Sequence, residues 1–260
     1  MKLGVNIDHV AVLREARQVN DPDILNALNV ACMNGADQIT IHLREDRRHI
    51  QDADAKNIML HSALPVNLEC SINRGILNIV TKLKPHRVTL VPEKREEVTT
   101  EGGLDVFNYA DEISNTIEEL HDFIIPVSLF IDPTIEAVEQ SKKLGAEMVE
   151  LHTGTFANIY NMLNSSLSYT NHSVKELELP RYELASRLEK SIQDIQKTAK
   201  HAKEIGLEVA AGHGLNYHNV HKMMEIQEIT ELNIGQSIIA RSVFSGLADA
   251  VKEMKRLTTR

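Results

Sequence analysis

Residues 41–50 concentrate ionisable groups directly after an apolar run. The run at 38–41 is rich in β-branched residues, which is typical of a buried strand. The stretch that follows contains two imidazoles, three guanidiniums and two carboxylates: His42, Arg44, Glu45, Asp46, Arg47, Arg48 and His49. Imidazoles and carboxylates transfer protons, and guanidiniums bind anions. A solvated charge run after an edge strand has the same composition, so this stretch alone leaves both interpretations open.

Most of the apolar runs along the chain end in polar or ionisable residues. In chain order these are Asn6, Asp8 and His9; His42 and Arg44; Glu69; Thr99, which follows the fourth run; Glu150 and His152; Gly212, His213 and Gly214; and Asn233 and Gly235. A single His or Glu in such a place is commonly a hydrogen-bonded rim residue, and Asn6 could simply bridge two strands. Several acids and bases together would each need a buried partner if their role were packing. The set therefore favours a functional site.

The apolar runs alternate with segments of helical length. We expect strands at 3–8, 38–43, 65–70, 87–92, 125–131, 148–153, 207–212 and 231–235, and helices at 22–34, 51–62, 71–83, 105–121, 133–144, 216–226 and 237–256. Asp21 and Pro22 are expected to be the N-cap and first residue of the helix at 22–34, which should close at Asn34 and Gly35. Eight strand–helix units predict an α/β fold, a (β/α)8 TIM barrel. An open doubly wound sheet is the alternative, but its glycine-rich dinucleotide fingerprint does not follow the first strand.

The connection between the sixth and seventh strands is much longer than the others. It contains an Asn-, Ser- and Tyr-rich piece at 156–173 and a helical pattern at about 180–205. We interpret residues 156–179 as an extra helical insertion in the sixth βα loop, followed by the regular helix. A single domain, 1–260, is therefore expected.

Composition and charge exclude several classes of partner. The 260 residues, 42% hydrophobic, suffice for one sizeable core that aliphatic side chains must fill. The formal charge of -9 argues against a nucleic-acid or membrane-surface binder, so any anionic ligand must be held by local cations. No apolar run approaches the ~20 residues that span a bilayer, and no signal peptide is recognisable. Cys32 and Cys70 show no metal or redox spacing, so we expect buried thiols in a reducing compartment, the cytoplasm.

Glycines flank the last two strand ends. Gly212 and Gly214 surround His213, and Gly235 precedes a helix expected to start near Ser237. Backbone N–H groups there could approach an anion, and a phosphate in this place is a recurrent feature of barrels. The same glycines would also serve as turn residues without any ligand.

A second anion site could use Arg44 and His49, with Arg17 as a further candidate from the first loop. Two phosphate sites in one mouth would imply two phosphorylated small molecules as partners.

A metal site is the alternative to a site that works by proton transfer and anion binding. The 12 histidines include no His-x-His pair on an expected strand and no His-Glu-x-x-His motif, so the spacing typical of zinc ligands is missing. His42, His152 and His213 could still meet in space. We expect no bound metal.

Eight segments, in order along almost the whole chain, resemble the pyridoxine 5'-phosphate synthase family. They are Gly-Val-Asn-Ile-Asp-His-Val-Ala (4–11), Ile-His-Leu-Arg-Glu-Asp-Arg-Arg-His-Ile (41–50), Asn-Leu-Glu (67–69), residues 91–106, Val-Ser-Leu-Phe-Ile-Asp (127–132), Glu-Leu-His-Thr-Gly (150–154), Ala-Gly-His-Gly-Leu-Asn-Tyr-His-Asn-Val (211–220) and Glu-Leu-Asn-Ile-Gly (231–235). The resemblance implies a (β/α)8 barrel that condenses 1-deoxy-D-xylulose 5-phosphate with 3-amino-2-oxopropyl phosphate. The products would be pyridoxine 5'-phosphate, inorganic phosphate and water. It further implies that no metal or organic cofactor is needed and that the chain forms a homo-octamer, a tetramer of dimers.

The resemblance also implies roles for individual residues. Proton transfer would fall to His42, Glu69 and His213, with Glu150 as a further participant. The amino-ketone phosphate would contact Asn6, Arg17, Gly214, Gly235 and Gln236, and the deoxyxylulose phosphate would contact Asp8, His9, Arg44, His49 and Thr99. Two features depart from a family member: Gln236 stands where that member has His, and the insertion at 156–179 is longer. An amide still donates to phosphate, but it does not titrate.

Residues 93–104 form a charged loop that ends in Gly102 and Gly103. Imine and enamine intermediates hydrolyse in water, so the implied reaction gains from closure of the mouth. We expect this loop to be open without ligand and to close over bound phosphate, with Thr99 donating a hydrogen bond. An exposed connector is the alternative.

Two other functions remain to be separated from this one. A sugar-phosphate isomerase or aldolase is the first, but a Schiff-base aldolase needs a Lys at a strand end and none of the eight ends supplies one. A non-catalytic phosphometabolite-binding barrel is the second. A pure binder would not need Glu69, Glu150 and three imidazoles around one anion, because carboxylates repel phosphate.

Overall fold

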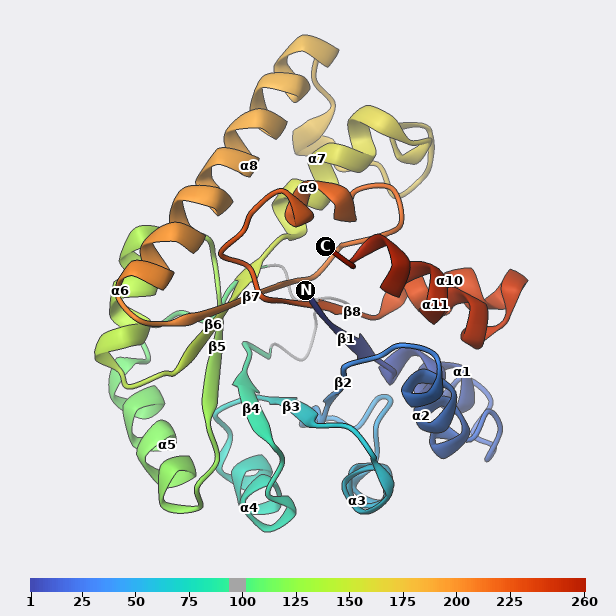
Figure 1. Ribbon diagram of the computed structural model, residues 1–260, viewed down its shortest axis with the longest axis vertical. Coiled ribbons are helices and arrows are strands. Elements are labelled where there is room, and N and C mark those ends of the chain that lie inside the picture. The colour runs from blue at the N-terminus through green and yellow to red at the C-terminus, as the bar shows by residue number, and fades with distance from the viewer. Residues whose placement is uncertain (94–101) are drawn as a thin grey trace.

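The computed structural model describes residues 1–93 and 102–260. Its centre is a closed barrel in which each parallel strand pairs with the next and β8 pairs with β1 (Figure 1). The strands are β1 Lys2–Asn6, β2 Gln38–His42, β3 Val66–Cys70, β4 Arg87–Leu90, β5 Val127–Ile131, β6 Met148–His152, β7 Glu208–Gly212 and β8 Glu231–Ile234. All eight predicted strands are confirmed, with ends that differ slightly from the predicted ones. The (β/α)8 TIM barrel is therefore confirmed, and the open-sheet alternative is wrong because the sheet closes.

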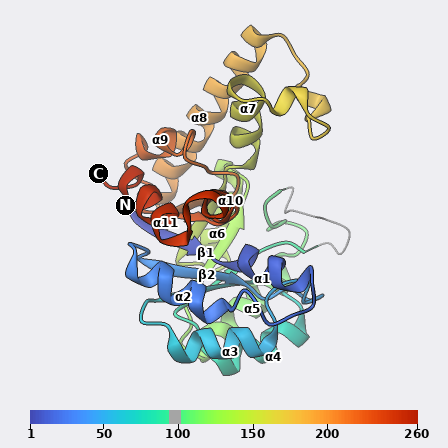
Figure 2. The same cartoon turned by 90° about the vertical axis from the view of Figure 1, so that its right-hand side faces the viewer.

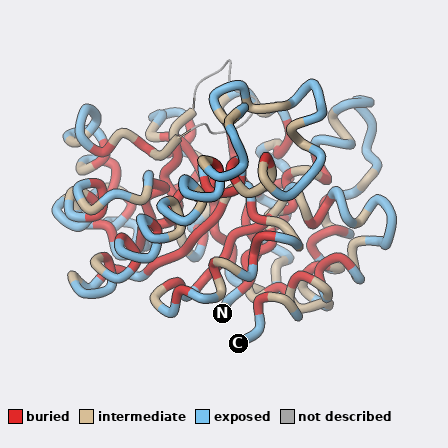
Figure 3. The backbone as a smooth tube through the Cα atoms, turned by 90° about the horizontal axis from the view of Figure 1, so that it is seen from above, coloured by how far each residue is buried: buried red, intermediate tan, exposed pale blue. Residues whose placement is uncertain are grey.

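Helices surround the barrel and bury its outer face (Figures 1 and 3). They are α1 Asp8–Glu15, α2 Ile24–Met33, α3 Asp52–His61, α4 Arg74–Leu83, α5 Ala110–Asp122, α6 Ile135–Lys143, α7 Gly154–Asn164, α8 Arg181–Glu204, α9 Val220–Met224, α10 Gln236–Ser245 and α11 Leu247–Leu257. Within the described parts of the chain, no helix is both long and apolar enough to cross a membrane.

Several helix boundaries differ from the predicted ones for local reasons. The N-cap of α2 is Asp23, whose carboxylate accepts the N–H of Leu25 at 2.9 Å, and not Asp21. Helix α5 begins at Ala110 rather than at 105, because Asp105 accepts two backbone N–H groups in the preceding turn. The predicted final helix is two helices, α10 and α11, separated by Gly246 with a φ of +78°. Helix α1 was not predicted.

The sixth βα loop carries the predicted helical insertion. Its first part is α7, so the Asn- and Ser-rich piece is helical at its beginning, and two short 3-10 turns, Leu167–Tyr169 and Lys175–Leu177, lead into α8. Figure 2 shows α7 and the start of α8 projecting away from the barrel. This projection has its own small apolar cluster around Ile159, Met162 and Leu184. Residues far from the barrel are thus held by a local core.

The barrel interior is polar, whereas the layer between strands and helices is aliphatic. Alternate strand positions such as Val5, Ile41 and Leu68 pack under the helices and are fully buried. The intervening positions bond to one another across the interior. Arg87 on β4 forms an ion pair with Glu231 on β8 and donates to the side-chain oxygen of Gln38 on β2 at 3.2 Å. Aliphatic side chains therefore fill the outer core as expected, but not the space inside the barrel.

Candidate active site

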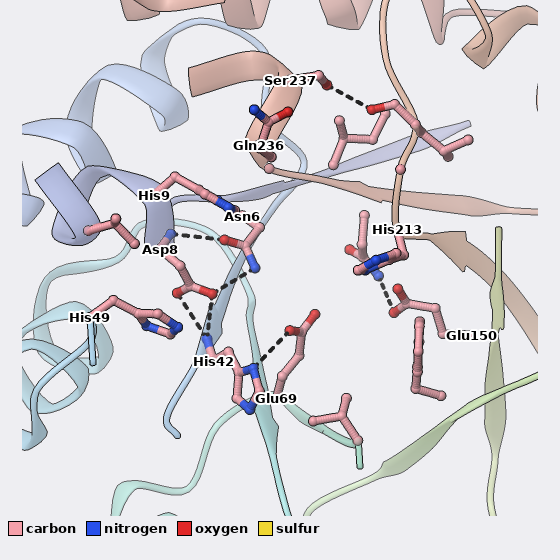
Figure 4. A pocket seen from close by; sticks show the side chains of 18 of the residues that line it. Asn6, Asp8, His9, His42, His49, Glu69, Glu150, His213, Gln236 and Ser237 are labelled. Atoms are coloured by element: carbon pink, nitrogen blue, oxygen red, sulfur yellow. Dashed lines mark hydrogen bonds and ion pairs between the residues drawn. The ribbon is translucent and has the colours of Figure 1, made fainter. Parts of the chain in front are cut away.

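A cavity of about 650 Å³ lies at the carboxyl ends of the strands. Its lining contains most of the predicted site residues: Asn6, Asp8, His9, His42, Arg44, His49, Glu69, Glu150, His213, Gly214, Gly235 and Gln236. Figure 4 shows how ten residues of the lining, from both ends of the chain, converge. Arg17 is exposed and is not part of this lining. Thr99 and most of the predicted lid at 93–104 lie outside the described residues.

The corner between β1 and α1 is fixed by Asp8. Its carboxylate accepts the backbone N–H of His42 at 3.0 and 3.1 Å and the side-chain amide of Asn6 at 2.9 Å. Burial raises the pKa of Asp8 to about 6, although His42, Asn6 and Arg44 oppose that rise. Asn6 and Asp8 thus tie the end of the first strand to the end of the second (Figure 4).

His42 lies between two carboxylates. Its Nδ1 is 4.0 Å from an Oε of Glu69, and its Nε2 is 2.7 Å from Oε1 of Glu93. The second oxygen of Glu93 accepts the backbone N–H of Glu45 at 3.0 Å. Sequence reasoning did not single out Glu93, because it begins a run of charged residues with no periodicity.

The two carboxylates beside His42 have opposite pKa shifts. Burial raises the pKa of Glu69 well above its ordinary value, and the nearby Glu150 and Asp8 raise it further. Burial alone would also raise the pKa of Glu93, but its bonds with His42 and Glu45 bring it below the ordinary value. At neutral pH Glu69 is therefore biased towards the acid form, and Glu93 is a carboxylate.

Glu150 is held by the polar network of the barrel interior. The side-chain amide of Asn233 donates to Glu150 at 2.7 Å, while its oxygen accepts the hydroxyl of Thr40 at 3.1 Å. Burial raises the pKa of Glu150 to about 7, and the charge of Glu231 contributes. A Cβ at position 212 would lie 2.1 Å from Oε1 of Glu150. Gly212 is thus needed to make room for this carboxyl group.

We expect Glu150 to make stability depend on pH. Because the folded-state pKa of about 7 exceeds the ordinary 4.5, the unfolded chain ionises first as pH rises. The contribution of Glu150 is therefore intact below about pH 4.5 and is lost as pH rises through 7. The unfolding free energy of Glu150→Gln minus that of the parent should therefore rise by about 1–3 kcal/mol from pH 5 to pH 8. Urea denaturation of both proteins at the two pH values measures this, and an equal difference at both would contradict it.

His213 is held in a left-handed backbone conformation, with a φ of +77°. Oγ1 of Thr153 lies 2.7 Å from the carbonyl oxygens of both Gly212 and His213, which share its one hydroxyl hydrogen, and this contact stabilises the turn. The ring of His152 lies 5.1 Å from that of His213, and Nδ1 of His152 is 3.2 Å from Asp132. Burial lowers the pKa of His213 to about 4, so its imidazole is neutral at neutral pH.

Two parts of the lining suit anions. The first turn of α10, at Gln236 and Ser237, borders the cavity, and a helix N-terminus attracts negative charge. At the second part, Nδ1 of His49 accepts the N–H of Ile50 at 2.8 Å, which leaves Nε2–H as the donor. Burial lowers the pKa of His49 to about 3, so it acts as a neutral donor beside the Arg44 guanidinium.

Within residues 1–93 and 102–260, no three His, Cys, Asp or Glu side chains are placed to hold a metal ion together. The two imidazoles of His152 and His213 are neighbours, whereas His42 pairs with Glu69 and Glu93.

The closed parallel barrel, with acids, imidazoles and anion-binding groups at its carboxyl-end mouth, places the protein among barrel enzymes in which strand ends carry the chemistry. Residues 3–260 match the family model described as pyridoxal phosphate biosynthesis protein PdxJ, and the chain belongs to this family. It is 80% identical over 260 residues to pyridoxine 5'-phosphate synthase from Sulfurimonas denitrificans, covering 100% of both chains. Identity to the protein of the same name from Aliarcobacter butzleri is 63% over 257 residues, which is 99% of this chain and 98% of the relative.

Solved structures with low sequence identity share the fold. N-(5'-phosphoribosyl)anthranilate isomerase from Pyrococcus furiosus matches with a TM-score of 0.56 at 14% identity, covering 99% of this chain and 98% of the other. Thiamine phosphate pyrophosphorylase from the same organism matches with a TM-score of 0.56 at 13% identity, covering 99% and 95%. These similarities concern the barrel architecture alone.

Proposed function

We propose that the protein is a pyridoxine 5'-phosphate synthase, which condenses 1-deoxy-D-xylulose 5-phosphate with 3-amino-2-oxopropyl phosphate to pyridoxine 5'-phosphate, inorganic phosphate and water. Family membership and the names of the full-length relatives support this reaction. The observation that carries it is the grouping of His42, Glu69 and Glu150 in one cavity, with both carboxyl pKa values raised. A carboxyl group whose pKa is raised to about 7, as that of Glu150 is, can both give and take protons at neutral pH.

The reaction requires several proton transfers. An amine adds to a ketone and loses water, phosphate leaves, and an aldol-like ring closure with dehydration makes the ring aromatic. Glu69 and His42, 4.0 Å apart, exchange protons around the amine and the sugar carbons. His213 protonates the departing or ring-closing oxygen, with Glu150 as a further participant. A phosphate dianion near His213 would raise its pKa and so favour the protonated imidazole that this step needs.

Two phosphate sites hold the substrates. The amino-ketone phosphate binds Asn6, Gly214, Gly235 and Gln236 at the start of α10, and the deoxyxylulose phosphate binds Asp8, His9, Arg44 and His49. All of these border the cavity. Arg17 and Thr99 are further proposed contacts to the first and second phosphate, respectively.

The direct test is incubation with each phosphate alone and with both. Pyridoxine 5'-phosphate, detected by absorbance and mass spectrometry only when both are present, is the expected result. Rearrangement of one substrate alone would instead identify an isomerase, cleavage of one would identify an aldolase, and binding without turnover would identify a phosphometabolite-binding barrel.

We further propose that the protein works as a homo-octamer in the cytoplasm. Exposed apolar side chains on neighbouring helices support an assembly: Leu13 of α1 is 51% exposed, and Val243 and Phe244 of α10 are 68% and 92% exposed. Cys70 is a buried thiol as expected, whereas Cys32 is only partly buried; both are free thiols, which suits a reducing compartment. Light scattering after size exclusion should give eight chain masses.

A further inference from the structure

Glu93 and Glu69 lie on opposite sides of the His42 imidazole, one beside each ring nitrogen. One oxygen of Glu93 lies 2.7 Å from Nε2 of His42, and Nδ1 on the other side of the ring faces Glu69 at 4.0 Å. The Glu93 side chain is only 4% exposed, so water does not compete strongly for this bond. Its second oxygen accepts the N–H of Glu45 at 3.0 Å, which prevents the carboxylate from turning away.

We infer that Glu93 is a positioning residue that holds His42 in the Nε2–H tautomer and leaves Nδ1 as the proton-accepting atom on the Glu69 side. A neutral imidazole has one N–H and one lone pair, and the partner of the first nitrogen decides which is which. When Nδ1 takes a proton, Glu93 stabilises the imidazolium and itself stays ionised. Only the expected effect on kcat rests on the proposed function. The tautomer of His42 does not depend on turnover.

Glu93→Gln tests this role because the substitution retains the size of the side chain and changes its donor pattern. The backbone N–H of Glu45 can only donate, so the single oxygen of the new amide is drawn to it. The NH2 group then faces His42 and favours the opposite tautomer, with Nδ1–H. We expect kcat to fall roughly 10- to 100-fold with KM changed little, which is less than the ~10²–10⁴ of a general base lost outright. Glu93→Asp, which keeps the charge, should recover part of the loss.

Two further variants separate positioning from a merely structural role. In a His42→Ala background, Glu93→Gln should lower kcat no further, because a residue that acts through His42 has nothing left to orient. Glu147→Gln is the matched control: its carboxylate also pairs with an imidazole, 2.9 Å from Nε2 of His121, and accepts a backbone N–H, that of Val127 at 2.8 Å, but it does not line the cavity. It should leave kcat within about twofold of the parent. A kcat of Glu93→Gln as high as that of the control, or an equal loss in both backgrounds, would overturn the inference.

A spectroscopic measurement on the unmodified chain is independent of catalysis and of how the variants fold. With 15N-labelled histidine, the imidazole nitrogens of His42, assigned by loss of their signals in His42→Ala, should show a protonated Nε2 and an unprotonated Nδ1 in the neutral form of the ring. A protonated Nδ1 with an unprotonated Nε2 would overturn the assignment, even if the protein made pyridoxine 5'-phosphate. If His42 showed the expected tautomer but the protein formed no product, the proposed function alone would be contradicted.

Discussion

Glu69→Gln is expected to lower kcat by ~10²–10⁴ while KM stays within a few-fold of the parent value. The amide has nearly the same shape, so the cavity and the neighbours of Glu69 should be retained. It cannot exchange a proton with His42, whose Nδ1 lies 4.0 Å away. Steady-state kinetics with both phosphorylated substrates measures the effect.

The control for this variant is again Glu147→Gln, which neutralises a carboxylate that does not line the cavity. Near-native turnover of Glu69→Gln would remove Glu69 from the proton transfers. A large rise in KM at unchanged kcat would assign it to substrate binding instead.

Arg87→Met is expected to destabilise the fold by about 3–5 kcal/mol. Arg87 is the cationic partner of Glu231, whose side chain is 2% exposed inside the barrel. Without the guanidinium, a buried carboxylate loses its ion pair, and the amides of Gln38 and Asn233 replace only part of that interaction. Urea denaturation at pH 7 should show the loss as a lower midpoint.

The double variant Arg87→Met/Glu231→Gln tests the cause of that loss. Since it removes both charges, it should be more stable than Arg87→Met alone. If the single variant stayed within about 1 kcal/mol of the parent, or if the double variant were no better, the ion pair would not be important for the barrel interior.

The barrel was predictable because its strands are short aliphatic runs separated by helical patterns. Residues such as His42, Glu69 and Glu150 were found because parallel strands in a closed barrel all end at one mouth. Their grouping therefore follows from strand position alone, without any knowledge of distances. The insertion was visible as a single long interval in an otherwise regular alternation.

Other features depend on contacts that sequence order does not reveal. Glu93 reaches His42 across 51 positions, and Asn233 reaches Glu150 across 83. Helix α1 escaped prediction because it begins only two residues after β1, with Asp8 as its first residue. The polar barrel interior was missed because Arg87 and Glu231 are each unremarkable until the closed sheet brings them together.

The stoichiometry of the condensation tests the central claim most directly. Purified protein would be given both phosphorylated substrates, and pyridoxine 5'-phosphate and inorganic phosphate would be quantified in the same samples over time. We expect the two products to appear together in equal amounts and neither to appear when one substrate is omitted. Release of phosphate without pyridoxine 5'-phosphate, or no product at all from the folded protein, would contradict it.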